Sequence, residues 1–138
     1  MSDSISYSAG YKYQLASTYT VTTPLRPTAT IKTDWLTLTS TGRLYINRAY
    51  AWDGPSGPTL DTRNFMRGSL IHDALYQLMR LRLLDPTTDR QTADAYLRTC
   101  CKEDGMSAVR ATWVYYSVRL GGGSSTDPEN ERPVLSAP

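Results

Sequence analysis

Cysteine, histidine and phenylalanine are scarce in this chain of 138 residues, which has two cysteines, one histidine and one phenylalanine. The two cysteines, Cys100 and Cys101, are adjacent, and neighbours on one backbone rarely satisfy the geometry that a disulfide requires. This excludes a small disulfide-stapled fold and favours synthesis in a reducing cytoplasm. The chain also has no apolar run that approaches the roughly 18 residues of a membrane span.

Excess charge of either sign is lacking as well. The formal net charge is +2, which argues against bulk electrostatic binding of nucleic acid. No nucleic-acid partner is therefore expected. The N-terminus, Met1–Ser6, lacks the basic and apolar regions of a signal peptide. The length predicts a single domain over residues 1–121 that needs no disulfide to fold, followed by a flexible, disordered tail over residues 122–138.

The residues that are present change in character near residue 61. Before it, Thr, Tyr, Val and Ile alternate with polar residues and predict strands within a β part of about residues 5–52. Strands are expected over residues 12–15, 18–23, 30–39 and 43–49, with Gly42 in the turn before the last of them. They would form a small antiparallel sheet, which a loop with two glycines and two prolines over residues 53–61 ends.

The following residues, 62–121, predict three helices. The first runs from Phe65 to about Arg82, the second from a cap at Thr88 or Asp89 to about Asp104, and the third from Ala108 to Leu120. Gly105 is expected to end the second helix and Ser107 to cap the third. The third helix carries Val109, Trp113, Tyr116 and Leu120 among its apolar residues. Strands followed by helices define an α+β class, in which we expect the first two helices to form an antiparallel pair.

The only histidine, His72, lies on the first predicted helix, with Tyr76 one turn later on the same face. In an antiparallel pair, Asp94 of the second helix would lie alongside this turn. Its carboxylate would bond one ring nitrogen of His72, fix the tautomer and leave the other nitrogen to activate water. His72, Tyr76 and Asp94 are therefore the candidate catalytic residues.

The loop before the first helix provides a candidate metal site. Carbonyl oxygens near Asp53 and Gly57, together with the carboxylate of Asp73, are oxygen ligands of the kind that Ca²⁺ prefers. Asp73 is rotated by about 100° from His72 on a helix, so it can face this loop while His72 faces the neighbouring helix. A Ca²⁺ ion there would polarise a substrate carbonyl and stabilise the developing oxyanion.

Each of these features also has a structural interpretation. A histidine that is bonded by a carboxylate can simply be a polar contact of the fold, and Asp94 can pair with Arg90 one turn earlier. The loop over residues 53–57 can be a tight turn between sheet and helix. The sequence leaves these alternatives open.

Four stretches occur in order over about residues 50–121, namely Trp52–Ser56, Leu70–Tyr76, Arg90–Asp94 and Tyr116–Gly121. Together they resemble a phage and prophage family that is catalogued as domain of unknown function 1353. The resemblance implies a bacteriophage late protein that is made in the host cytoplasm. One role open to a late protein is incorporation in the virion, with other phage structural proteins as partners.

A second, weaker resemblance concerns the arrangement of the site. A glycine-containing loop, then His-Asp-x-x-Tyr at residues 72–76, then an aspartate on the next helix are similar to phospholipase A2. That resemblance implies that His72 is the general base and that Tyr76 and Asp94 orient it. It also implies that Asp73 and carbonyls near Asp53 and Gly57 bind calcium, and that host membrane phospholipid is the substrate.

Three classes of function follow from these observations. The first is a calcium-dependent lipid ester hydrolase that acts at the host membrane during entry or lysis. The second is a non-enzymatic structural virion protein, such as a minor tail or baseplate component, and the third is a small host-interaction effector. Strand edges and a tail favour protein–protein interaction, whereas the loop, the histidine and two aspartates together favour the hydrolase.

Overall fold

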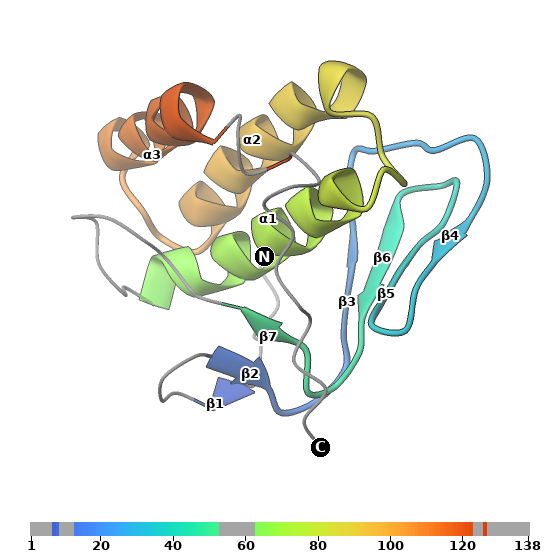
Figure 1. Cartoon of the computed structure of the whole chain (residues 1–138). Coiled ribbons are helices and arrows are strands. Elements are labelled where there is room, and N and C mark those ends of the chain that lie inside the picture. The colour runs from blue at the N-terminus through green and yellow to red at the C-terminus, as the bar shows by residue number, and fades with distance from the viewer. Residues whose placement is uncertain (1–6, 9–12, 53–62, 123–125, 127–138) are drawn as a thin grey trace. The chain divides into compact units, whose positions relative to one another are not determined.

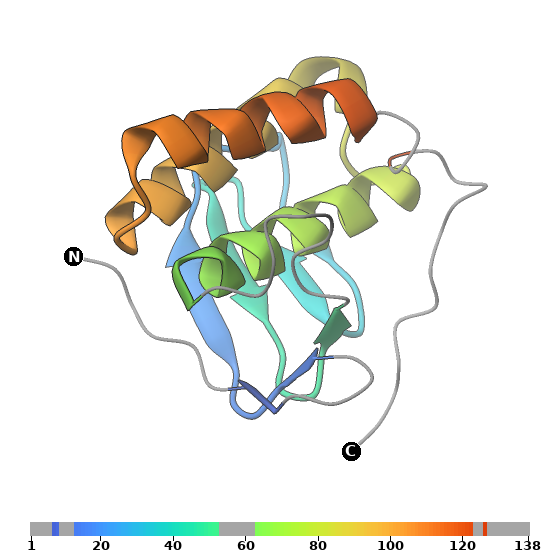
Figure 2. The same cartoon turned by 90° about the vertical axis from the view of Figure 1, so that its left-hand side faces the viewer.

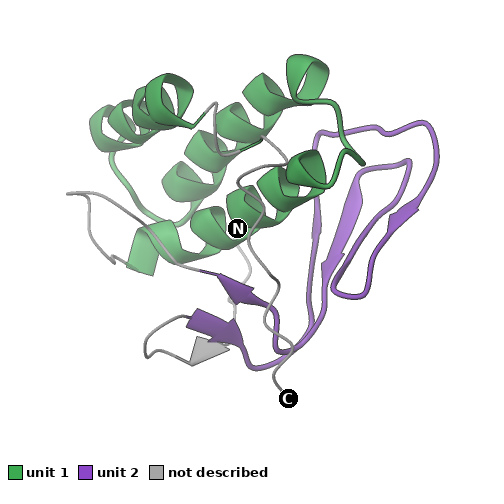
Figure 3. Cartoon of the chain, viewed as in Figure 1, with its two compact units in different colours: residues 1–3, 54–132 green, residues 4–53, 133–138 purple. Residues whose placement is uncertain are grey.

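The computed structural model describes residues 7–8, 13–52, 63–122 and 126. The chain divides into two compact units, one of residues 4–53 and 133–138 and one of residues 1–3 and 54–132 (Figure 3). Strands come first and helices after, which confirms the α+β class (Figure 1). The expected tail over residues 122–138 lies outside the described residues, apart from Gly122 and Thr126.

The unit of residues 4–53 and 133–138, unit 2 in Figure 3, is called the β unit here. Its described part holds two antiparallel sheets, where the sequence predicts one. The three-stranded sheet has the order β1-β2-β7, with strands Tyr7–Ser8, Tyr13–Leu15 and Ala51–Trp52. The four-stranded sheet has the order β3-β6-β5-β4. Its strands are, in chain order, Tyr19–Thr22, Ile31–Lys32, Leu36–Leu38 and Arg43–Ile46.

The chain leaves the four-stranded sheet near Ala49, which has a φ of 75°. This left-handed conformation bends the chain between β6 and β7. The Ala49 amide donates to the carbonyl of Leu15 at 2.8 Å. The strand that the sequence predicts over residues 43–49 therefore ends at Ile46. The chain then joins the three-stranded sheet as β7.

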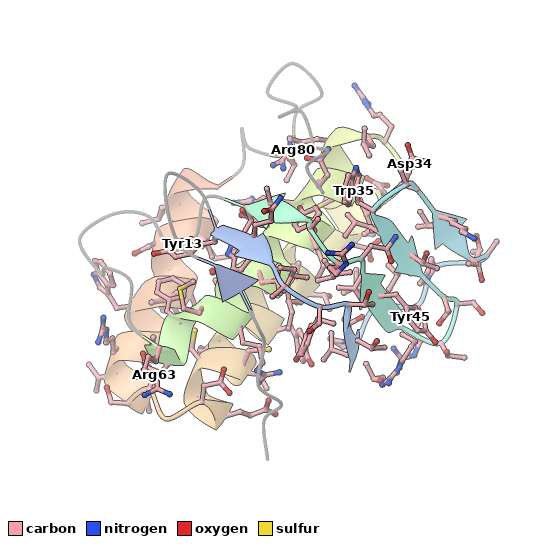
Figure 4. The ribbon with its side chains drawn as sticks, turned by 90° about the horizontal axis from the view of Figure 1, so that it is seen from below. Tyr13, Asp34, Trp35, Tyr45, Arg63 and Arg80 are labelled. Atoms are coloured by element: carbon pink, nitrogen blue, oxygen red, sulfur yellow. The ribbon has the colours of Figure 1, made fainter. Side chains whose placement is uncertain are left out.

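The strand predicted over residues 30–39 is interrupted by a turn at Thr33. The Thr33 hydroxyl accepts the backbone N–H groups of Trp35 at 3.2 Å and Leu36 at 2.9 Å. Such local side-chain bonds compete with a continuous strand, so β4 folds back and pairs with β5. Figure 4 shows Asp34 and Trp35 in this turn.

The central strand β6 follows the period of two that a half-buried strand requires. Leu44 and Ile46 are fully buried, whereas Tyr45 between them is exposed (Figure 4). Leu36 and Leu38 of β5 lie directly across from Ile46 and Leu44. The apolar alternation in the sequence thus becomes one buried face of the sheet.

The other unit, unit 1 in Figure 3, is called the helical unit here. It contains helices α1 (Arg63–Arg80), α2 (Pro86–Glu103) and α3 (Ala108–Gly121). All three predicted helices are confirmed. As predicted, Gly105 follows the end of α2 with a φ of 103°, and Ser107 caps α3 by accepting the backbone N–H of Arg110. None of the three described helices is long and apolar enough to cross a bilayer.

The start of α2 is where the helix prediction is wrong. The cap is Asp85, whose carboxylate accepts the backbone N–H of Thr87 at 3.0 Å, instead of the predicted Thr88 or Asp89. Pro86 then occupies the first turn, where its missing N–H costs nothing and its fixed φ suits a helix. The Asp-Pro pair therefore starts α2 as well as separating it from α1.

Helices α1 and α2 form the predicted antiparallel pair, and α2 also packs against α3 (Figure 2). Gly68 of α1 allows a close approach, because a Cβ there would lie 2.9 Å from a methyl carbon of Leu97. The buried Arg67 guanidinium binds Glu103 at 2.8 Å and Asp104 at 3.0 Å. These ion pairs join the start of α1 to the end of α2 and favour the antiparallel orientation.

The core of the helical unit combines side chains from all three helices. Its buried members are Phe65, Leu97, Cys101, Met106, Ala111 and Val114. Apolar α1 positions that the sequence assigns to the first helix, Met66, Leu70, Leu78 and Met79, are also buried. The four apolar residues assigned to the third helix are instead exposed, since α3 packs through Ala111 and Val114.

Cys100 and Cys101 are free thiols with no exposed surface. Burial raises the pKa of Cys100 to about 11 and that of Cys101 to about 12. We expect a thiol reagent at pH 8 to modify the native protein at least about 10³-fold more slowly than the unfolded chain. A colorimetric thiol count, with and without denaturant, measures this. Rapid modification of either cysteine in the native protein would contradict the burial.

The same two groups make the fold sensitive to alkali. Their folded-state pKa values are raised, so the stability that comes from burying neutral thiols is fully present below the ordinary thiol pKa of about 8.5. It is lost as the pH rises toward about 11 and 12. A double Cys-to-Ala variant is therefore expected to lose less stability than the native chain between neutral pH and this range.

Candidate functional site

His72, Tyr76 and Asp94 come together in the helical unit. His72 Nε2 lies 2.6 Å from Oδ1 of Asp94, and the Tyr76 hydroxyl donates to the same oxygen at 2.6 Å. All three side chains are buried, and Asp94 has no exposed surface. The structure therefore brings together the three residues that the sequence predicts as the catalytic group.

The helix pair explains why these residues meet. His72 and Tyr76 are one turn apart on α1, and their rings lie 4.1 Å apart between centroids with an interplanar angle of 38°. Asp94 lies near the middle of α2, which runs back along α1. Both α1 side chains reach the same oxygen of Asp94. The imidazole of His72 therefore contacts the carboxylate through Nε2 and the Tyr76 ring through its own ring.

Asp94 is kept ionised by its partners. Burial alone would raise the pKa of the Asp94 carboxyl, but hydrogen bonds from His72 and Tyr76, the charge of His72 and a hydrogen bond from Arg119 together hold it below its usual value. An ionised carboxylate only accepts hydrogen bonds, so Asp94 carries no proton that it could donate near neutral pH. Asp94 can therefore fix the orientation of His72.

Tyr76 is held as a neutral phenol. Burial, and then its hydrogen bond to the Asp94 carboxylate, raise the pKa of Tyr76 well above its usual value. Its hydroxyl donates to Asp94 and accepts the Nε–H of Arg90 at 3.1 Å. The hydroxyl is thus a fixed link between the aspartate and the arginine, and it does not supply a proton to chemistry.

Two arginines belong to this cluster, and sequence reasoning assigned neither of them to the site. Arg119 of α3 donates to Oδ2 of Asp94 at 2.9 Å. Arg90 lies 3.9 Å from the same oxygen and donates to the carbonyls of Val118 and Arg119 at the end of α3. The sequence raised Arg90 only as a structural partner of Asp94. The signal for both was that they lie within two of the stretches that carry the family resemblance.

A glycine also shapes the cluster. A Cβ at Gly122, directly after α3, would lie 3.0 Å from the Tyr76 hydroxyl and closer still to the Val118 carbonyl. Gly122 therefore lets the chain pass close to Tyr76 at the end of α3. His72 of α1 and Arg119 of α3 both contact Asp94 of α2, so three helices converge on this carboxylate.

The predicted calcium site is described only in part. Asp73 lies on α1, next to His72, and is partly exposed. Asp53 and Gly57 lie outside the described residues. Within the described ranges, no group of three or more His, Cys, Asp and Glu side chains is arranged to hold a metal ion. A site of one carboxylate and backbone carbonyls is not such a group, so the calcium hypothesis stays a prediction.

The two ring nitrogens of His72 differ in their hydrogen bonding. Among the hydrogen bonds of the described residues, those of His72 use Nε2 alone. The ring is slightly exposed, with 11% of the side chain accessible. The geometry therefore presents one imidazole nitrogen that is oriented by a carboxylate and one that is left for chemistry.

Comparisons with family models, with curated proteins and with solved structures return no match for this chain. The class that fold and site define is an α+β protein with a buried His–Asp–Tyr cluster. The two resemblances drawn from the sequence therefore bear on function only as proposals.

Proposed function

We propose that this chain is a phage-encoded hydrolase of lipid esters that uses His72 as its general base. One observation carries the proposal: His72 Nε2 lies 2.6 Å from the fully buried carboxylate of Asp94. A contact of this length to an ionised carboxylate places the ring proton on Nε2. In the neutral ring, Nδ1 carries a lone pair and can accept a proton from water.

The chemistry follows from this proton arrangement. Nδ1 of His72 takes a proton from a water molecule, whose oxygen forms a bond to the carbonyl carbon of the ester. When the tetrahedral intermediate collapses, the bond from that carbon to the alcohol oxygen breaks. The protonated His72 returns its proton to the departing alcohol, so a fatty acid and a lysolipid are released. Asp94 stabilises the imidazolium in between.

Asp73 is the one described residue among the calcium ligands that the phospholipase resemblance implies. Asp73 supplies a partly exposed carboxylate next to His72, and a carboxylate is a preferred ligand of Ca²⁺. Carbonyls near Asp53 and Gly57 would complete the set. Bound there, Ca²⁺ would supply a positive charge that polarises the ester carbonyl.

Fatty-acid release from mixed phospholipid vesicles tests the proposal. We expect the purified protein to hydrolyse the vesicles with millimolar Ca²⁺ and to lose this activity in excess chelator, because the ester carbonyl then lacks its polarising charge. Asp73→Asn should behave in Ca²⁺ as the native chain does in chelator. The matched control is Asp89→Asn on α2, which is expected to keep the activity.

Two results would contradict the proposal. Absence of fatty-acid release under all conditions, together with a melting temperature that Ca²⁺ does not change, would exclude the calcium-dependent hydrolase. Equal activity with Ca²⁺ and with chelator would leave a hydrolase but exclude the metal, and the role of Asp73 with it.

A structural virion protein is the second candidate, and one observation favours it. Besides His72, the Asp94 carboxylate accepts from Tyr76 and Arg119, while Arg90 binds Tyr76 and two carbonyls of α3. These contacts join three helices and have no necessary part in ester hydrolysis. A tail or baseplate component would use the cluster only to hold the helical unit together.

A further inference from the structure

Helix α3 is apolar on two opposite faces. Ala111 and Val114 are buried in the core of the helical unit. Four larger side chains are exposed, namely Val109 (84%), Trp113 (48%), Tyr116 (57%) and Leu120 (88%). At 3.6 residues per turn these four lie within a stripe about 60° wide, about 160° from the buried face. We call them the α3 stripe.

The stripe is unusual for a solvent-exposed helix face. Single exposed apolar residues are common, but a contiguous row of four over the length of one helix marks a contact surface. In Figure 1, α2 lies between α1 and α3, so α3 is at the edge of the helical unit. The stripe therefore has no partner among the described helices.

The charged residues of α3, Arg110 and Arg119, are both positive. Residues 105–122 include no Asp or Glu. Arg110 and Arg119 lie about 90° to either side of the stripe by helical geometry. The occupant of the stripe is thus expected to be apolar with an anionic surface.

A second copy of this chain fits the stripe poorly. Pairing two α3 helices would bring arginines toward arginines, with no acidic residue on α3 to offset them. Helix α3 has 14 residues and is about 21 Å long, so its stripe offers less than the roughly 800 Å² per partner of a specific dimer.

We propose that the α3 stripe docks on the surface of an anionic lipid bilayer. Val109 and Leu120 at its two ends would enter the acyl boundary, while Trp113 and Tyr116 between them are residues that favour the headgroup level. Arg110 would face the lipid phosphates, and the part of Arg119 that is exposed beside its bond to Asp94 would add positive charge at the other end of the stripe. This surface lies on the same unit as the His72 cluster and would hold a lipid hydrolase at its substrate, but the docking itself needs no catalysis.

Co-flotation with vesicles tests the docking. The vesicles contain equal amounts of phosphatidylglycerol and phosphatidylethanolamine, with phosphatidylcholine vesicles as the neutral comparison. We expect the full chain to float with the anionic vesicles, less with the neutral ones, and less again as salt is raised. The double variant Val109→Ser/Leu120→Ser should bind the anionic vesicles at least about tenfold more weakly, because two apolar anchors are lost.

The matched control is Leu83→Ser, which changes an exposed leucine outside α3. It should bind as the native chain does, and both variants should keep the native melting temperature. The proposal is overturned if the native chain does not float, if it binds both vesicle types equally, or if the double variant binds normally. A dimer in sedimentation that the double variant dissociates, without flotation, would assign the stripe to a second copy.

His72→Ala separates this proposal from the proposed function. We expect it to float as the native chain does, whatever its activity, because His72 is on α1 and outside the stripe. Flotation without hydrolysis by the native chain would contradict the hydrolase and support the docking. Hydrolysis without any dependence on Val109 and Leu120 would contradict the docking alone.

Discussion

Asp94→Ala is expected to lower the free energy of unfolding by about 3 kcal/mol. The Asp94 side chain has no exposed surface and accepts hydrogen bonds from His72, Tyr76 and Arg119. Its removal leaves a buried imidazole, a buried phenol and a guanidinium without their common acceptor. We place the loss at the lower end of the range for broken buried ion pairs because Arg119 is 30% exposed and can turn to water.

The effect of Asp94 depends on pH in a defined direction. Its folded-state pKa is lowered, so its stabilisation is present above the ordinary Asp pKa of about 3.9 and is lost as the pH falls through the folded value. The difference between native chain and Asp94→Ala should therefore shrink as the pH falls below about 4.

Denaturant titrations at several pH values measure this difference. Asp34→Ala, which removes an exposed carboxylate in the β unit, is the control and should change stability by less than about 0.5 kcal/mol. An equally small loss for Asp94→Ala would show that the buried contacts contribute little. It would remove the basis for both functional interpretations of the cluster.

His72→Ala is expected to reduce vesicle hydrolysis by about 10²–10⁴-fold, the usual contribution of a general base. The change removes the nitrogen that accepts the proton from water. It also removes one donor to Asp94, which should cost about 1–2 kcal/mol of stability and leave the protein folded. Initial rates of fatty-acid release, at protein concentrations corrected for the folded fraction, measure the effect.

Tyr76→Phe is the matched control for His72→Ala. It removes a donor to the same Asp94 oxygen at the same distance of 2.6 Å, so its stability loss should be similar. It leaves the base in place, so the loss of activity should be only about tenfold. Equal rates for the two variants would contradict the assignment of His72 as the base.

The two variants together separate the two candidate functions. A hydrolase requires that His72→Ala and Tyr76→Phe agree in stability but differ strongly in rate. A structural virion protein requires that both lower the melting temperature while the native chain has no hydrolytic activity to lose. In that case the role of the cluster would be to hold α1, α2 and α3 together through Asp94.

The sequence by itself determined the class and the catalytic candidates. Alternation before residue 61 and helical periodicity after it are local patterns, so they predict the α+β class and all three helices. The spacing of His72 and Tyr76 on one helix, with Asp94 on the next, predicts their meeting because two helices joined by a short connection pack antiparallel. Gly105 and Ser107 were found for the same reason, since helix ends depend on near neighbours.

Only the tertiary structure decided which partners each residue finds at long range. Arg119 reaches Asp94 across 25 positions of sequence, and no local pattern indicates such a contact. The apolar residues of α3 showed helical spacing, but the sequence could not tell which of its two apolar faces is buried. The small Ala111 and Val114 are buried in the core, and Trp113 and Leu120 are exposed. Close packing against α2 depends on the shape of the neighbouring helix as well as on hydrophobicity, and small side chains allow the helices to approach.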